Sequence, residues 1–197
     1  MMPQFIATPV PSGPPRHLLW TVDQFHYLGD LGMFEGRRAM LIDGVIVEEG
    51  PMNPPHRIAL ELTTDAIRAI FGSGWRICVQ MPLALGQTTD PSPDIAVIAG
   101  TARGTSSHPS TSVLVIEVAD TSLNYDTTTK AELYATAGIA DYWVVDVGSR
   151  QSLVFRDPTP IAAGGIAYRT HLTFGVNDSI APLAALASPI RVIDLLP

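Results

Sequence analysis

The chain has 197 residues and a formal net charge of −7, and 46% of its residues are hydrophobic against 16% that are charged. This balance excludes an intrinsically disordered protein and allows one domain with a sizeable core. The acidic charge argues against a protein that coats nucleic acid through a basic surface. The single cysteine, Cys78, excludes an internal disulfide and a cysteine zinc cluster.

The N-terminal segment differs in composition from the rest. Residues 1–17 are rich in proline and small residues, which predicts a flexible arm before a single domain that spans residues 18–197. The arm lacks the basic leader and continuous apolar core of a signal peptide, and no apolar run reaches the roughly 20 residues of a membrane helix. We therefore expect a cytoplasmic protein with no membrane partner.

The next segments predict a helix, a hairpin and a second helix. Apolar residues at helical spacing over 18–32 indicate a helix that Thr21 caps and Gly32 ends. Two short strands follow, joined by an Asp-Gly pair that is typical of a tight hairpin. These strands are 39–42 and 45–48. Asn53 and two prolines predict the start of the second helix, which Gly72 ends. Its expected apolar face consists of Ile58, Leu62, Ala66, Ile67, Ile70 and Phe71.

The remainder alternates strands with one more helix. A helix is expected over 126–137, ended by Gly138. The expected strands are 75–85, 95–98, 113–118, 142–147, 152–155 and 167–174. The pattern predicts an α/β fold with a mixed central β-sheet flanked by helices.

Two carboxylates stand in positions where the surrounding residues predict burial. Glu117 interrupts the apolar run Leu-Val-Ile-Glu-Val, and Asp94 follows Pro93 at the head of another apolar run. An ionised carboxylate in a core is costly without a partner. If the two strands are neighbours, the acids could share one site, and a hard divalent ion suits such a pair. The residues therefore suggest a Mg²⁺ or Mn²⁺ site that acts on a phosphate ester.

Lys130 is the only lysine among the 12 basic residues of the chain. In a helix that starts near Asp126, residues Asp126, Lys130 and Tyr134 lie on one face. An ammonium beside a metal-bound water can orient the water or offset charge on the phosphate.

Each of these residues also has an ordinary structural interpretation. Asp94 could cap a turn, and Glu117 could pair with an arginine. Asp126 could be the N-cap of its helix, or form a surface pair with Lys130, and Tyr134 could be a core residue.

Three segments together resemble a bacterial restriction-endonuclease-like family of the PD-(D/E)XK nuclease superfamily. They are SPDIAVI, LVIEVADTS and YDTTTKAELYATAGIADYWVVD. The resemblance implies a restriction-endonuclease-like fold with Asp94 and Glu117 as metal-binding acids, and it adds the backbone carbonyl of Val118 as a metal ligand. The superfamily's usual lysine position is Ala119 in this chain, and the family is expected to supply the lysine from the next helix, at Lys130.

Two further positions concern the completeness of the site. His56 begins the second helix, where similar sequences carry a histidine, and it is either an accessory site residue or an ordinary helix-start residue. Relatives often have an acid where this chain has Met40. Possible substitutes for that acid are Glu48, Glu49 and Glu61.

The resemblance implies an endonuclease that uses Mg²⁺ or Mn²⁺ to hydrolyse DNA phosphodiester bonds. The alternatives are a catalytically silent binding or regulatory module that keeps the nuclease fold, and a small phosphodiesterase. A homodimer is plausible, because nucleases that cut both strands often pair two sites. The arginines that are candidates for phosphate contacts are Arg37, Arg38, Arg57, Arg68 and Arg103.

Overall fold

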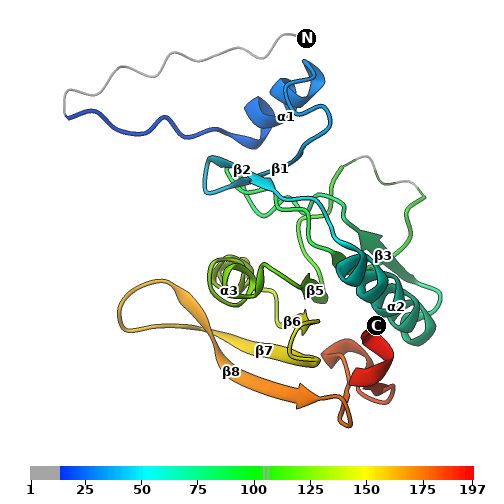
Figure 1. Ribbon diagram of the computed structural model, residues 1–197. Helices are drawn as coiled ribbons and strands as arrows, with labels where there is room; N and C mark the ends of the chain where they lie inside the picture. The colour runs from blue at the N-terminus through cyan, green and yellow to red at the C-terminus, as the bar shows by residue number, and fades with distance from the viewer. Residues whose placement is uncertain (1–13, 104, 106) are drawn as a thin grey trace. The chain divides into compact units, whose positions relative to one another are not determined.

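The computed structural model of the protein describes residues 14–103, 105 and 107–197 (Figure 1). Residues 1–13 of the predicted arm lie outside the described residues. By its internal contacts the chain divides into two compact units. Unit 1 comprises Met1–Pro51 and Ala84–Pro91, and unit 2 comprises Met52–Leu83 and Ser92–Pro197. The single domain over residues 18–197 stays a prediction.

Unit 1 contains the first helix and the hairpin, as the sequence predicted. Helix α1 (Val22–Asp30) is capped by Thr21, whose hydroxyl accepts the N–H of Gln24 while the Gln24 side chain accepts the N–H of Thr21. Strands β1 (Arg38–Ile42) and β2 (Val45–Glu49) pair in antiparallel register. The turn residues Asp43 and Gly44 have φ of 48° and 78°. Two consecutive positive φ values are what a tight two-residue hairpin turn requires.

Unit 2 is built on a six-stranded mixed sheet, which confirms the predicted fold class. The strand order is β3-β4-β5-β6-β7-β8. The strands are β3 (Trp75–Val79), β4 (Ile95–Ala99), β5 (Leu114–Ala119), β6 (Asp141–Asp146), β7 (Gln151–Pro160) and β8 (Ile166–Gly175). Only β5 and β6 run parallel within this sheet. A parallel pair needs a long crossover connection, and here the connection is helical.

The predicted strand over 75–85 is wrong in its second half. Strand β3 ends at Val79, because Gln80 adopts a φ of 51° that no extended strand can contain. Pro82 follows and has no N–H for a ladder. An apolar sequence therefore continued past the point where the backbone leaves the sheet.

Helix α2 (Pro54–Phe71) is capped by Asn53, whose side chain accepts the N–H of His56, and it ends at Gly72, as predicted. Its buried face differs from the expected one, because Ile58 and Leu62 are 46% and 37% exposed. Ile67 and Phe71 are buried as predicted, and the other buried residues are Ala59, Leu60, Thr63 and Thr64. Periodicity of apolar residues missed the two threonines, although a buried hydroxyl needs only a local acceptor. The Thr63 hydroxyl lies 3.5 Å from the carbonyl of Leu195.

The crossover from β5 to β6 begins earlier than predicted. It consists of α3 (Leu123–Tyr125), a π-helical turn η1 (Asp126–Lys130) and α4 (Ala131–Thr136). Ser122 is the N-cap, and Asp126 lies inside the helix and is 1% exposed. The interpretation of Asp126 as an N-cap is therefore wrong. Its side chain is directed inward, where an N-cap would bond the backbone of its own first turn.

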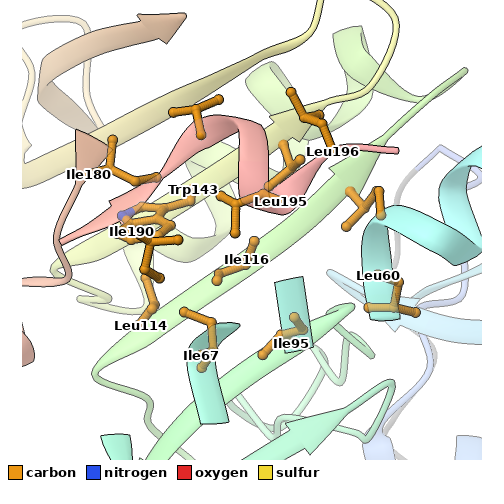
Figure 2. Close-up of a cluster of buried hydrophobic side chains, with 14 of the residues drawn as sticks. Leu60, Ile67, Ile95, Leu114, Ile116, Trp143, Ile180, Ile190, Leu195 and Leu196 are labelled. Atoms are coloured by element: carbon orange, nitrogen blue, oxygen red, sulfur yellow. The ribbon is translucent and has the colours of Figure 1, made fainter. Parts of the chain in front are cut away.

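One face of the sheet carries the main core. Alternate residues of β4, β5 and β6 pack here against α2 and the C-terminal segment (Figure 2). That segment contains β9 (Ser179–Ile180), η2 (Leu183–Ala185), β10 (Ile190–Arg191) and η3 (Val192–Leu195). The sheet, α2 and the C-terminal segment all contribute side chains to this core, among them Leu60, Ile67, Ile116, Trp143, Ile190 and Leu195. The C-terminal segment therefore packs on the core of its own chain.

The opposite face of the sheet carries the helical crossover (Figure 1). Ile116 and Val118 belong to the main core, so Glu117 between them points to the crossover side. A cluster of aromatic rings lies on this side and surrounds Tyr142. The rings are those of Tyr134, Tyr142, Phe155 and Tyr168. A carboxylate is thus held among aromatic rings and helical backbone.

Candidate active site

Glu117 lies in the middle of a group of buried polar side chains. It is 2% exposed. The hydroxyl of Tyr134 donates to Glu117 Oε1 at 2.7 Å, and Lys130 Nζ lies 3.1 Å from Glu117 Oε2. The expected alternative of an arginine partner is wrong, since the cation is the lone lysine. Tyr134 is both a core residue, with no exposed surface, and a hydrogen-bond donor to the site.

Asp94 is locked against Glu117 by the backbone of both strands. The N–H of Asp94 donates to Glu117 Oε2 at 3.3 Å, and the N–H of Val118 donates to Asp94 Oδ2 at 2.9 Å. Ile95 and Ile116 are paired in the ladder, so Asp94 and Glu117 occupy the next facing positions. The two acids from separate strands therefore meet, as the sequence predicted. Asp94 does not merely cap a turn.

Lys130 is buried between two carboxylates. Its Nζ lies 3.3 Å from Asp126 Oδ1 as well as close to Glu117, and its side chain is 5% exposed. The ring of Tyr125 lies below the ammonium, 6.0 Å from ring centre to Nζ. The Asp126–Lys130 pair is therefore not a surface pair. The structure brings Asp94, Glu117 and Lys130 together, which is the juxtaposition that the sequence analysis required.

His56 approaches the same group from the start of α2. Its Nε2 lies 3.4 Å from Asp94 Oδ1, and the side chain is 15% exposed. This nitrogen has no hydrogen-bond partner among the described residues. Asn53 fixes the start of the helix, because its amide also donates to Asp120 just beyond β5. His56 therefore lies both in the first turn of α2 and beside Asp94.

The electrostatics separate the two acids. Burial raises the pKa of Asp94, but the nearby His56, the Gln80 amide and the Val118 N–H together lower it below its usual value. Burial raises the pKa of Glu117 to about 8, where the Lys130 ammonium opposes the shift and the Asp94 carboxylate adds to it. Two neighbouring acids with pKa values pushed apart are typical of functional sites. Burial thus favours the protonated form of Glu117, whereas the hydrogen bonds to Asp94 favour its ionised form.

The Val118 carbonyl is directed to the same edge as Asp94. The carbonyl of Ala119 accepts from Val147 on the β6 side, so the backbone of Val118 faces the other edge. The Val118 N–H donates to Asp94 Oδ2 at the β4 edge of β5. The N–H and the carbonyl of one strand residue point to the same edge, so the Val118 carbonyl also faces β4. Pro93 is the next residue opposite Val118 and has no N–H to donate. This carbonyl is therefore available to a ligand beside Asp94.

Ala119 explains why the lysine comes from elsewhere. Residues two apart on a strand share a face, so a lysine at 119 would extend to the Glu117 side. This position is alanine, fully buried at the end of β5. Lys130 reaches the same side from the crossover helix. An ammonium can serve one carboxylate from either element, since only its final position matters.

Gln80 contacts the site, and the sequence analysis did not single it out. Its amide Nε2 donates to Asp94 Oδ1 at 3.0 Å, and its N–H donates to the Asp94 carbonyl at 3.1 Å. The left-handed backbone of Gln80 aims both donors at one residue. A positive φ at glutamine is uncommon and is not encoded by a local motif. No sequence signal could have found it.

Of the four positions considered for a further acid, Glu61 alone belongs to the same unit as Asp94 and Glu117. Met40 is buried in unit 1. Glu48 and Glu49 also belong to unit 1 and pair with Arg37 and Arg38. In unit 2, Glu61 is exposed on α2.

The residues present fit a hard divalent cation of the Mg²⁺ type. Within the described ranges, no group of three or more His, Cys, Asp or Glu side chains is arranged to hold a metal. Mg²⁺, however, is usually held by one or two carboxylates together with waters and substrate oxygens. Asp94, Glu117 and the Val118 carbonyl would supply three oxygen donors. The buried Nε2 of His56 lies 3.4 Å from Asp94 Oδ1 and makes no hydrogen bond in the described part of the chain.

Among the helices that the structure describes, none combines the length and apolar character needed to cross a lipid bilayer.

Comparisons with known proteins agree with this architecture. Residues 22–188 match the model of the Uma2 family, whose description is "Putative restriction endonuclease". A crystal structure of "a putative nuclease belonging to DUF820" from Anabaena variabilis ATCC 29413 superposes with a TM-score of 0.69. The two share 16% identity over 89% of this chain and 96% of the other, which shows the fold alone. No curated protein matches. Because the family model spans most of the sequence, the chain belongs to the Uma2 family of restriction-endonuclease-like proteins.

Proposed function

We propose that the protein is a Mg²⁺-dependent endonuclease that hydrolyses phosphodiester bonds in DNA. The observation that carries this proposal is the convergence of Asp94, Glu117 and Lys130, with Lys130 Nζ 3.1 Å from Glu117 and the Asp94 N–H 3.3 Å from the same carboxylate. Structural ion pairs also converge in cores, but here one acid carries a strongly raised pKa beside another with a lowered one. Membership of the Uma2 family supports the same reaction class.

Each residue has a role in this proposal. Asp94, Glu117 and the Val118 carbonyl would hold the cation, which when bound polarises a phosphoryl oxygen and lowers the pKa of water. Lys130 would donate a hydrogen bond to the attacking water and offset charge that develops on the phosphate. Tyr134 keeps Glu117 oriented through its hydroxyl. His56, partly buried next to Asp94, would orient that carboxylate from the side of α2.

The direct test uses supercoiled plasmid with Mg²⁺ or Mn²⁺. The wild-type protein should nick the plasmid, whereas Asp94→Ala and Lys130→Met variants purified in the same way should not. Equal nicking by all three proteins would identify a contaminating nuclease and refute the proposal.

Two other functions predict different results. A silent module that keeps the fold need not bind a metal, so isothermal titration with Mn²⁺ separates it from a nuclease. A small phosphodiesterase would cleave a chromogenic diester but would not retain DNA at low salt. The nuclease proposal requires both metal binding and DNA retention.

DNA binding should depend on a small number of arginines. Arg37, Arg38 and Arg68 face carboxylates, whereas Arg57 and Arg103 form no ion pair in the described part of the chain. Arg57 is exposed and follows His56 at the start of α2. It is therefore the best placed arginine for a phosphate next to the site.

The Arg57→Ala variant should bind DNA more weakly, and the slope of log Kd against log salt should fall by about 1. Arg68→Ala is the matched control, since Arg68 lies on the same helix beside Asp65. We expect its salt slope to equal that of the wild type. Fluorescence anisotropy with a labelled duplex in Ca²⁺ measures both, and identical slopes for the two variants would refute this role of Arg57.

Removal of the Gln80 amide should weaken metal binding, because this amide orients the Asp94 carboxylate. Loss of such an outer partner typically costs about 10-fold or more in metal affinity. Gln80→Ala and Gln80→Gly should lose similar affinity for Mn²⁺. The glycine variant should be more stable by about 1 kcal/mol, because only alanine retains the strain of a positive φ. Wild-type affinity in either variant would contradict the orienting role.

If each copy carries one such site, two copies would be needed to cut both strands of a duplex. We therefore infer a homodimer on DNA. Sedimentation velocity with and without a duplex tests this, and a monomer in both conditions would contradict it.

A further inference from the structure

Asp126 is a buried acid that the proposed reaction does not use. It is 1% exposed, and its Oδ1 lies 3.3 Å from the ammonium of Lys130, which also pairs with Glu117. Apart from this ion pair, Oδ1 has no hydrogen-bond partner among the described residues. Burial raises the pKa of Asp126, although the ammonium of Lys130 opposes this shift. A further buried carboxylate lowers stability unless an opposite charge and hydrogen bonds compensate for its loss of hydration.

The backbone and two side chains hold Asp126 in place. The hydroxyl of Ser122 donates to Asp126 Oδ2 at 2.5 Å, and the hydroxyl of Tyr142 donates to the Asp126 carbonyl at 2.8 Å. The π-helical turn begins at Asp126 and ends at Lys130, so the widened turn separates these two residues. Single π turns occur frequently at functional sites. Ser122 and Tyr142 thus hold Asp126 in place, while its Oδ1 faces the ammonium.

The binding of a cation would affect the Lys130–Glu117 and Lys130–Asp126 ion pairs differently. Glu117 Oε2 holds the ammonium at 3.1 Å, and the same carboxylate is a proposed metal ligand. A divalent cation on Glu117 repels an ammonium at that distance, so the ammonium must move away from Glu117. An ammonium held by Glu117 alone would then either compete with the metal for this carboxylate or leave the site. A second, rigid partner prevents both results.

We infer that Asp126 is a positioning residue that retains Lys130 beside the site when a divalent cation takes Glu117. This inference rests on the proposed function and goes beyond it, because it assigns Asp126 to the lysine and not to the metal. An Asp–Lys pair four residues apart on a helix is often incidental. This pair differs because both members are buried, they are joined by a π turn, and the acid is braced by Ser122 and Tyr142.

A double-mutant cycle on Mn²⁺ affinity tests the inference without any measurement of cleavage. Asp126→Asn should weaken Mn²⁺ binding by roughly tenfold, because the ammonium then stays on Glu117 and competes with the cation. In a Lys130→Met background, where no ammonium competes, the same substitution should change the Kd by less than about twofold. An equal loss in both backgrounds would show that Asp126 acts on the cation directly, and would overturn the inference.

A second measurement uses the fact that Lys130 is the only lysine. Protein labelled with ¹³C at the lysine ε carbon gives one signal. In the wild type, saturating Mg²⁺ should leave this signal as broad as that of a buried side chain, because Asp126 keeps the ammonium. In Asp126→Asn, the same addition should narrow it towards a free lysine. A wild-type signal that narrows as much as the variant's would overturn the inference, even if Lys130→Met did not fold.

These measurements also distinguish a failure of the proposed role of Asp126 from a failure of the proposed metal site. A wild-type protein that binds neither Mn²⁺ nor Mg²⁺ would refute the proposed metal site, and the inference would fall with it. Tight wild-type binding with no coupling between Asp126 and Lys130 would refute the inference alone. Thermal melting of each variant in the absence of metal identifies any loss that comes from unfolding.

Discussion

The Glu117→Gln variant should lose metal-dependent DNA cleavage by roughly 10³-fold. Glutamine has nearly the same shape, but its neutral amide offers the cation no charge. A divalent cation at the reacting phosphate contributes several kcal/mol of transition-state stabilisation, and each 1.36 kcal/mol is tenfold in rate. Plasmid nicking under single-turnover conditions, together with Mn²⁺ titration, measures the loss. Under the proposed role of Glu117 as a metal ligand, both activity and metal affinity should fall.

The matched control is Glu61→Gln, which removes the same charge from the exposed face of α2 in the same unit. This control should cleave and bind Mn²⁺ like the wild type. Circular dichroism should show folded protein for both variants. Cleavage by Glu117→Gln within about tenfold of the wild type would contradict the assignment, because metal chemistry is worth more than that.

The second large effect is on stability in the absence of metal. Relative to Glu117→Gln, the wild-type protein should lose several kcal/mol of its free energy of unfolding as pH rises from about 4.5 to about 8. Burial raises the pKa of Glu117 from its ordinary 4.5 to about 8. The folded protein therefore binds this proton more tightly than the unfolded chain does. The stabilising contribution is complete below pH 4.5 and is lost as pH rises through 8.

Urea denaturation of both proteins at intervals from pH 4.5 to 9 measures this difference. The comparison with Glu117→Gln cancels titrating groups far from Glu117, whereas Asp94 and Asp126 interact with it and contribute to the measured difference. A pH-independent difference would mean that Glu117 is ionised in the folded protein throughout. The same shift predicts that Mn²⁺ binding releases about one proton below pH 8, because metal ligands must be deprotonated. Titration calorimetry in two buffers of different ionisation enthalpy counts that proton.

Local features of the fold could be predicted because their causes lie within a few residues. The Thr21 capping box, the Asp43-Gly44 turn and the Asn53 cap each depend on backbone groups that neighbours in sequence must satisfy. Features that depend on distant partners were missed or misplaced. The left-handed Gln80 ends β3 against an apolar pattern, and its donors serve Asp94, 14 residues away.

The sequence by itself pointed to the residues of the candidate site. A carboxylate inside an apolar strand, an acid after Pro93 and one lone lysine each violate the local pattern, and burial makes such violations costly enough to require a partner. The tertiary structure alone decided which partner each group has. The strand register sets Asp94 against Glu117, and the π turn places Asp126 and Lys130 as a buried pair. Distances between strands and helices depend on packing over the whole core, and no short segment of sequence encodes them.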